Sequence, residues 1–184
     1  MATTFNTTLT RRILLVMAWV IFAGLGIDAG GIIVYSIGSL VTKAGAPVHF
    51  WQAVDLSNLL AFDRSHFITL VSIMTIVAVV KTVMFYFIVR ILHDNRLNIV
   101  RPFNRQLTSF VVLISYLSMV IGLFSLAGTR FTEWLAERGT QFPTIESLRL
   151  GGGDVWLFMS VTLFVIAVIF KRGIEIQEEN DLTV

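Results

Sequence analysis

The sequence predicts an all-α integral membrane protein, a four-helix bundle that forms one transmembrane domain over residues 1–184. Hydrophobic residues make up 55% of the chain and charged residues only 14%, with a mean hydropathy of +0.80. A soluble domain of this length carries about 25% charged residues. The apolar residues gather in segments that reach, or nearly reach, the roughly 20 helical residues needed to cross a bilayer. The predicted spans are residues 13–39, 66–90, 107–127 and 154–171.

Lysine and arginine in the flanks of these spans predict the orientation. Positive charges in short loops and at helix ends favour the cytoplasmic side. One side carries Arg11, Arg12, Arg90, Arg96, Arg101, Arg105, Lys171 and Arg172. The other side carries Lys43, Arg64, Arg130, Arg138 and Arg149. The first set lies in shorter segments and against helix ends, so both termini are predicted to be cytoplasmic.

The first external loop, residues 40–65, is predicted to contain a short helix lying in the membrane interface. Phe50, Trp51 and Phe62 are spaced so that their rings would lie at headgroup level. Two histidines and two aspartates in and beside this loop are of the types that bind metals, but their spacing matches no ligand motif. These residues are His49, Asp55, Asp63 and His66. No metal site is therefore predicted.

The second external loop, residues 128–153, is predicted to contain a similar interfacial helix. Phe131 and Trp134 share one face, the charged residues Glu133, Glu137 and Arg138 occupy the other, and Gly139 is placed to end the helix. Three consecutive glycines, residues 151–153, precede the fourth span. They lack the Lys-Ser/Thr pair and the G-x-G-x-x-G spacing of phosphate-binding loops, so a flexible hinge is predicted.

Two ionisable residues, Asp28 and Lys81, fall inside predicted spans. Each costs about 2.5 to 3.5 kcal/mol at the bilayer centre on insertion scales, which indicates a partner or a function. Counting residues from Arg12 and Arg90 at about 1.5 Å per residue separates the two in depth by roughly 10 Å. This estimate disfavours a direct ion pair. The open alternatives are structural roles, with Lys81 reaching the cytoplasmic interface, or a proton or ion pathway.

The first span is rich in glycine around Asp28. Gly26 and Gly30 form a small-xxx-small face, which is typical of close packing against another helix. The same glycines could instead open the helix around a ligand, as in the half-helices of transporters. Close packing is the favoured interpretation.

Two segments of opposite charge are predicted to meet on the cytoplasmic side. The internal loop, residues 90–105, is basic and contains a rigid turn with an aromatic ring, whereas the cytoplasmic tail, residues 173–184, is acidic and has no basic residue. The tail is expected to bind a protein partner or to dock on its own loop. The candidate partner-binding residues are Arg96, Arg101, Pro102, Phe103, Arg105, Glu175, Glu178, Glu179, Asn180, Asp181 and Leu182.

The end of the chain, Gly-Ile-Glu-Ile-Gln-Glu-Glu-Asn-Asp-Leu-Thr-Val, resembles that of an uncharacterised bacterial family of four-span membrane proteins, the domain of unknown function numbered 2975. Pro102-Phe103 resembles the Pro-Phe that opens the third helix of that family after a basic internal loop. The resemblance implies a bacterial protein of the cytoplasmic (inner) membrane. Members are often encoded beside a small Cro-type helix-turn-helix regulator, which implies such a regulator as partner.

These observations predict a non-enzymatic membrane protein that regulates or anchors a cytoplasmic protein. An acidic tail is complementary to the basic DNA-reading face of a helix-turn-helix protein. The alternatives are an accessory subunit of a larger membrane complex and, less favoured because no internal repeat is evident, a small transporter that uses Asp28 and Lys81.

Several functional classes lack support in the sequence. It contains no H-E-x-x-H, no G-x-S-x-G and no aspartate pair across two spans, so no catalytic residues are predicted. It also contains no cysteine and no large basic patch. Membrane lipid and a protein partner are expected to contact the chain, and neither a cofactor, a metal nor direct nucleic-acid binding is expected.

Overall fold

The computed structural model describes residues 7–41, 56–93, 104–138 and 148–181, and the regular elements in these ranges are all helices. The helices are α1 (Thr7–Val41), α2 (Ser57–Phe62), α3 (Arg64–His93), α4 (Arg105–Ala136) and α5 (Gly153–Asp181). All except α2 are long and apolar enough to cross a membrane. The all-helical class and the four potential spans are therefore confirmed, and the helices extend beyond the predicted spans.

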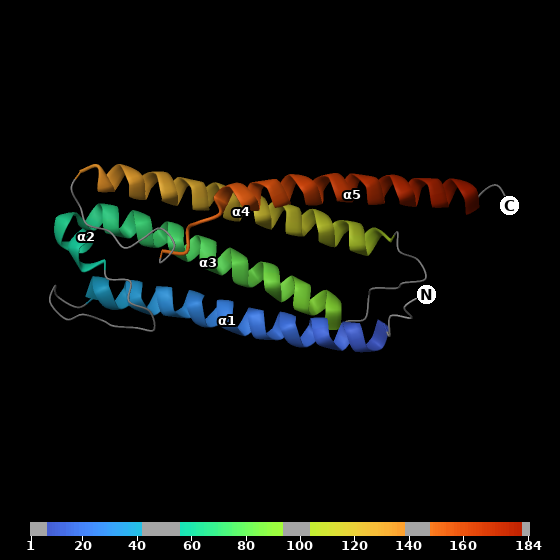
Figure 1. Ribbon diagram of the computed structural model, residues 1–184, viewed down its shortest axis with the longest axis horizontal. Helices are drawn as coiled ribbons and strands as arrows, with labels where there is room; N and C mark the ends of the chain where they lie inside the picture. Colours follow the sequence, from blue (N-terminus) through green and yellow to red (C-terminus); the bar gives the residue numbers. More distant parts are fainter. Residues whose placement is uncertain (1–6, 42–55, 94–103, 139–147, 182–184) are drawn as a thin grey trace, which may run out of the picture.

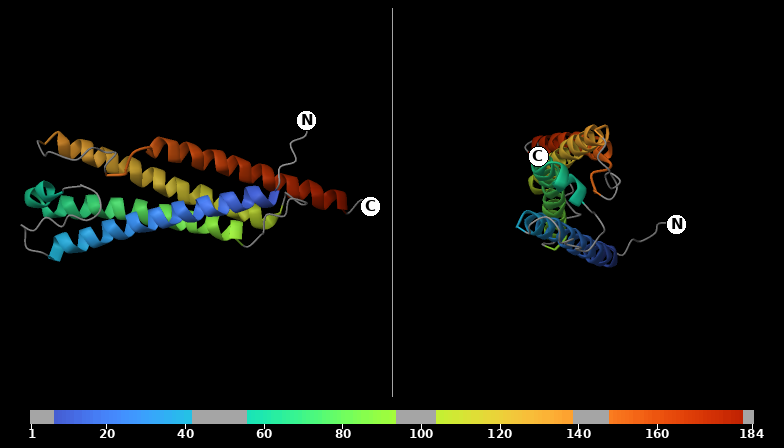
Figure 2. Two further views of the ribbon diagram at one scale, coloured as in Figure 1. Left: turned by 60° about the horizontal axis from the view of Figure 1, so that its bottom comes forward. Right: turned by 90° about the vertical axis from the view of Figure 1, so that its left-hand side faces the viewer.

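The four long helices form an open row rather than a closed square. Figure 1 shows α1 at the bottom, α3 above it and α4 and α5 at the top, and the end-on view in Figure 2 also shows α3 between α1 and the α4–α5 pair. α1 packs on α3, α3 on α4, and α4 on α5. Among the described helices, no Cα atom of α1 lies within 8 Å of one in α4 or α5. Each terminal helix of the row thus has a single long helix as its neighbour.

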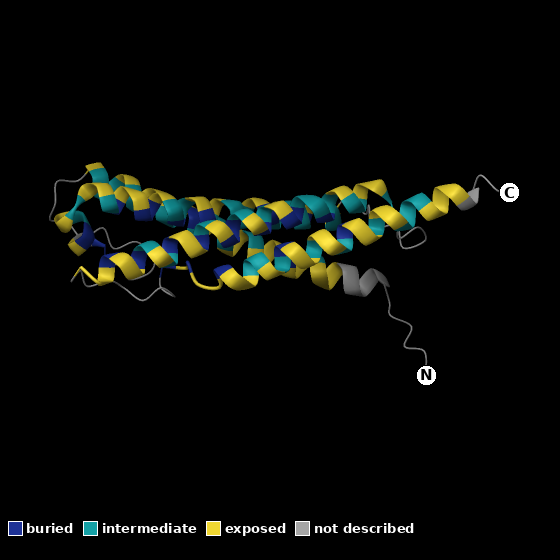
Figure 3. Cartoon of the chain, turned by 90° about the horizontal axis from the view of Figure 1, so that it is seen from above, coloured by how far each residue is buried: buried dark blue, intermediate teal, exposed yellow. Residues whose placement is uncertain are grey.

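The apolar core lies along α3 and α4, at the centre of the row. Phe67 and Leu70 of α3 and Ile121 of α4 are fully buried there. In α1, by contrast, the buried apolar residues are the small Ala18 and Ala29. Figure 3 shows exposed residues along the outer faces of the helices, and many of them are large and apolar. Such a surface suits contact with lipid.

The end of the row that carries α2, which is predicted to be its outer end, differs in detail from the predicted interfacial helices. Residues 128–136 form the last turns of α4 rather than a separate helix, and Phe131 and Trp134 stack on His66 of α3. In the first loop, α2 is a single short helix whose Leu59 is buried in the core. The aromatic residues Phe50 and Trp51 lie outside the described residues. Gly139 also lies outside them.

The opposite end of the row, which is predicted to be its inner end, includes the start of α4 and the end of α5. The side chain of Asn104 caps α4 by accepting a hydrogen bond of 2.6 Å from the backbone N–H of Leu107. α5 continues as helix past Lys171 and Arg172. The acidic tail is therefore helical as far as Asp181, and it extends the helix beyond its apolar part.

Candidate functional site

The chain returns to the middle of the row just before α5, through the non-helical residues 148–152. Leu148 and Leu150 are 1% and 0% exposed, so both point into the core. Arg149 lies between them with a positive φ of 56°, a left-handed conformation that costs a non-glycine residue about 1 to 3 kcal/mol. Gly152, at φ 75°, completes the turn into α5 without such a cost. Contacts of Arg149 account for the strained conformation.

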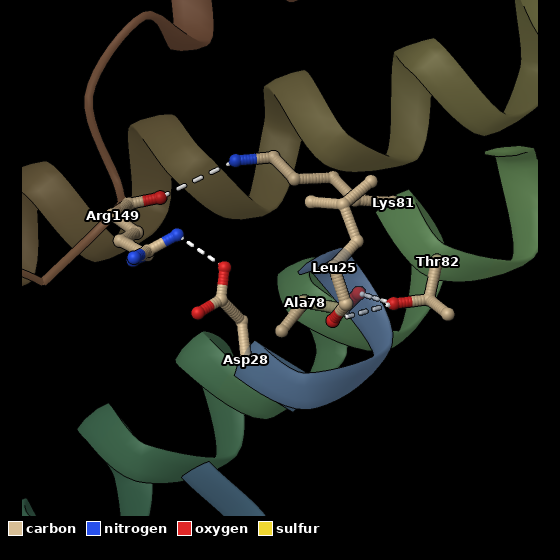
Figure 4. Close-up of polar contacts among 6 residues, drawn as sticks. All are labelled: Leu25, Asp28, Ala78, Lys81, Thr82 and Arg149. Atoms are coloured by element: carbon tan, nitrogen blue, oxygen red, sulfur yellow. Dashed lines mark hydrogen bonds and ion pairs between the residues drawn. The ribbon is translucent and has the colours of Figure 1, made fainter. Parts of the chain in front are cut away.

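Arg149 joins α1 to α3 through two polar contacts, which Figure 4 shows. Its guanidinium Nη1 donates a hydrogen bond to Oδ2 of Asp28 in α1, and the two groups form an ion pair. Its backbone carbonyl accepts a hydrogen bond of 3.4 Å from Nζ of Lys81 in α3. The same ammonium lies 5.6 Å from the centroid of the Trp156 ring in α5. Asp28, Lys81 and Arg149 therefore form one polar cluster, here named the central cluster.

The central cluster also satisfies backbone groups that lack helical partners. A carbonyl in the hydrocarbon region needs a hydrogen-bond donor from the protein, since water is scarce there. Lys81 provides one for Arg149, and the hydroxyl of Thr129 in α4 donates to the carbonyl of Leu150 at 3.4 Å. The carbonyls of Arg149 and Leu150, which lie outside the helices, are thus paired with side chains of α3 and α4.

The estimate of a 10 Å depth difference between Asp28 and Lys81 is wrong. The hydroxyl of Thr82 in α3 donates to the carbonyl of Leu25 in α1 at 3.1 Å, so these two residues lie at one level. Because α1 and α3 run antiparallel, Asp28 and Lys81 then differ in depth by only about 3 Å at 1.5 Å per residue. The estimate failed because it took Arg12 and Arg90 to lie at one depth.

A small pocket lies beside the central cluster, with a volume of about 50 Å³. Charged side chains form part of its wall, and apolar side chains of α1, α3 and Leu148 form the rest. The residues that line it are Leu25, Asp28, Ile32, Met74, Val77, Ala78, Lys81, Leu148 and Arg149. The pocket is large enough for water-sized ligands and too small for most metabolites.

Close helix packing occurs between α4 and α5 and not at the predicted glycines. A methyl group on Gly122 would lie 2.7 Å from Cγ of Leu157, and one on Gly153 would lie 2.9 Å from the backbone nitrogen of Leu126. A methyl group on Gly26 or Gly30 would meet no neighbouring atom within 4 Å. If the small-xxx-small face of α1 packs on a helix, that helix is not among those described.

Charged residues of the predicted partner-binding set meet at the inner end. Nη2 of Arg105, at the start of α4, lies 2.8 Å from Oε1 of Glu178 in α5. Glu175 pairs with Arg172 at 2.9 Å, and Glu179 is exposed. The tail is thus connected to the end of its own internal loop. The described structure does not include Arg96, Arg101, Pro102, Phe103, Leu182 or the side chains of Asn180 and Asp181.

Arg149 is the residue of the central cluster that the sequence analysis missed, because it was assigned to the external flank. Its neighbours in the sequence gave a signal: a single arginine lies between two leucines, and the second leucine directly precedes three glycines. Such an apolar and flexible stretch is able to enter the core. The partner of Asp28 is therefore Arg149, and Lys81 contacts the backbone of that same residue.

No protein-family model matches the chain, and neither a curated protein nor a solved structure matches it. The likeness of the tail to the bacterial four-span family therefore stays a prediction. Among the residues that the structure describes, no group of three or more His, Cys, Asp or Glu side chains is placed to hold a metal ion.

Proposed function

We propose that this protein is a non-enzymatic, multi-pass protein of the bacterial cytoplasmic membrane that holds a cytoplasmic protein through the acidic end of α5. The observation that carries the proposal is the helical extension of α5 beyond Lys171 and Arg172. A rigid helix presents its carboxylates at fixed positions, which lowers the ordering cost of binding. The extension also presents the apolar side chain of Ile176, which is 53% exposed.

The ion pair between Arg105 and Glu178 fits this proposal because it is easily exchanged. The Arg105 side chain is 80% exposed and the Glu178 side chain 56% exposed. Exposed pairs contribute about 0.2 to 1 kcal/mol, so a basic surface on a partner could replace Arg105 at little cost. A helix-turn-helix regulator has such a surface, because it binds DNA phosphates.

A photo-crosslinking amino acid at Gln177, in the acidic extension, tests the proposal in native membranes. We expect an adduct with a soluble basic protein, and we expect the Glu175→Gln, Glu178→Gln, Glu179→Gln variant to lose it. The matched control, Glu133→Gln with Glu137→Gln at the outer end of the row, should leave the adduct unchanged. An adduct that persists in the triple variant, or no adduct at all, would contradict the proposal.

The proposed orientation has a separate test that uses the absence of cysteine from the chain. Gln177→Cys should react with a membrane-impermeant maleimide only after the membrane is opened. Glu137→Cys, at the opposite end of the row, should react in intact cells. The reverse pattern would place the acidic extension outside the cytoplasm and would remove the proposed partner.

A second candidate function, an accessory subunit of a larger membrane complex, has an observation of its own. α1 packs along one long helix, and a methyl group on Gly26 or Gly30 would meet no neighbouring atom within 4 Å. Small residues allow close approach of helices in lipid, so this face fits a helix of another protein. Gly26→Ile with Gly30→Ile should then dissociate a larger assembly in mild detergent. An unchanged native mass would exclude this face as the contact.

A further inference from the structure

The pocket beside the central cluster contains an ammonium group whose charge is poorly compensated. Nζ of Lys81 contacts the carbonyl of Arg149 at 3.4 Å and faces the Trp156 ring at 5.6 Å. The carbonyl oxygen and the face of the ring each carry only a partial negative charge. The carboxylate of Asp28 is bound by the guanidinium of Arg149, and no described carboxylate forms an ion pair with Lys81. A full positive charge therefore faces the pocket at the middle of the row.

An uncompensated cation at this depth attracts a counter-ion strongly. Electrostatic attraction grows as the surrounding dielectric constant falls, and mid-membrane lysines are usually paired for this reason. The pocket is also able to hold an ion: its volume of about 50 Å³ exceeds the roughly 10 to 15 Å³ that one water-sized occupant needs on the same kind of measure.

The charges and the wall of the pocket together select the kind of ion. Two cationic side chains and one carboxylate line it, which repels a metal cation. The remaining wall consists of apolar groups such as Ile32, Met74 and Val77. These groups cannot hydrogen-bond the oxygens of a large or doubly charged anion. A small monovalent anion with weak hydration fits both conditions.

We infer that the pocket between α1, α3 and Arg149 binds a small monovalent anion of the halide class, with the ammonium of Lys81 as its main contact. This site is independent of the partner bound by the acidic extension. Lys81 would then have two roles, because the ammonium that contacts the anion also donates a hydrogen bond to the carbonyl of Arg149, in the segment before α5. Anion binding would therefore hold that segment in place.

Trp156 offers a direct probe because its ring lies close to Lys81. Bromide quenches indole fluorescence at short range, so bromide bound to the ammonium of Lys81, which lies 5.6 Å from the centroid of the Trp156 ring, should quench Trp156. The experiment uses the full-length chain in detergent with the other tryptophans replaced by Trp19→Phe, Trp51→Phe and Trp134→Phe. We expect quenching with a saturable component at constant ionic strength. Chloride should compete this component away, whereas gluconate should not.

Two variants in the same background assign the site. Lys81→Met should lose the saturable component and retain only collisional quenching, which is linear in bromide concentration. Arg138→Met removes a cation at the outer end of the row, far from the pocket, and should retain saturation. Circular dichroism and thermal unfolding of each variant establish whether it is folded.

Each result decides the inference. Linear quenching alone in the parent protein would show that the pocket holds no halide, whatever the variants do. Saturation that persists in a folded Lys81→Met protein would place the anion elsewhere. If Lys81→Met does not fold, the competition between chloride and bromide in the parent still decides whether an anion binds beside Trp156.

Discussion

The two outermost helices of the row, α5 and α1, are held to their neighbours by different interactions. α5 is joined to α4 by close contact at Gly122 and Gly153. The hydroxyls of Ser115 and Ser160 also donate to each other's backbone carbonyls, both at 2.9 Å. Lipid tails are as apolar as leucine side chains, so helices in a membrane associate through such fits and hydrogen bonds. The α4–α5 pair uses both.

α1, on the opposite side of the row, has neither close glycine contacts at its small-xxx-small face nor reciprocal serine hydrogen bonds to its neighbour among the described residues. It buries the small residues Ala18 and Ala29, and one hydroxyl of α3 donates to its backbone. The ion pair of Asp28 with Arg149 connects it to the segment before α5. α1 therefore combines apolar contacts of partly buried residues such as Ile32 and Tyr35 with a few polar contacts at one level, whereas the start of α5 is held by close packing and paired hydrogen bonds. Polar contacts can respond to an ion, and close packing cannot.

The largest expected loss of stability comes from the polar contact between Asp28 and Arg149. Arg149→Met leaves the Asp28 carboxylate without the guanidinium in a mid-membrane position. Because the Arg149 side chain is 42% exposed, we expect destabilisation near the lower end of the insertion cost of a charge, about 2.5 kcal/mol. Unfolding in mixed micelles measures it.

The matched control for this prediction removes both charges. Asp28→Asn with Arg149→Met should recover most of the lost stability, because no unpaired charge remains. If Arg149→Met alone is as stable as the parent protein, α1 does not depend on the central cluster.

The next largest loss of stability is expected where α4 packs on α5. Gly122→Ala places a methyl group 2.7 Å from Cγ of Leu157 and should destabilise the protein by about 2 kcal/mol, as overpacking does elsewhere. Gly26→Ala is the matched control, since its methyl group meets nothing within 4 Å. Equal unfolding free energies for the two variants would show that α4 and α5 are not in close contact.

The smallest effect concerns the serine pair that accompanies this packing. Ser115→Ala removes one of the two reciprocal hydrogen bonds, and interhelical hydrogen bonds in membranes contribute about 0.6 kcal/mol on average. We expect a loss of that size in the same unfolding assay. A double-mutant cycle with Ser160→Ala measures the coupling between the two hydroxyls, and additive losses would mean that they act independently.

Much of the fold was predictable because it depends on local properties of the sequence. The length of an apolar segment determines whether it can span a bilayer, and four such segments predicted the four long helices. The second interfacial helix was not obtained, because residues 128–136 continue α4 without a break.

The site was only half predictable, for a physical reason. A charged residue within an apolar span indicates by itself that it needs a partner, so Asp28 and Lys81 were found from the sequence. The identity of the partner depends on which distant segment returns to the same depth. Arg149 lies 121 positions from Asp28.

The sequence by itself determined that this chain has four potential membrane spans with two charges inside them, since span length and charge position are local quantities. Only the tertiary structure decided that the spans form a row, that α4 and α5 provide the close glycine contacts, and that Arg149 completes the central cluster. These features depend on contacts between residues far apart in the chain, and many pairings of the same helices satisfy the hydropathy pattern equally well.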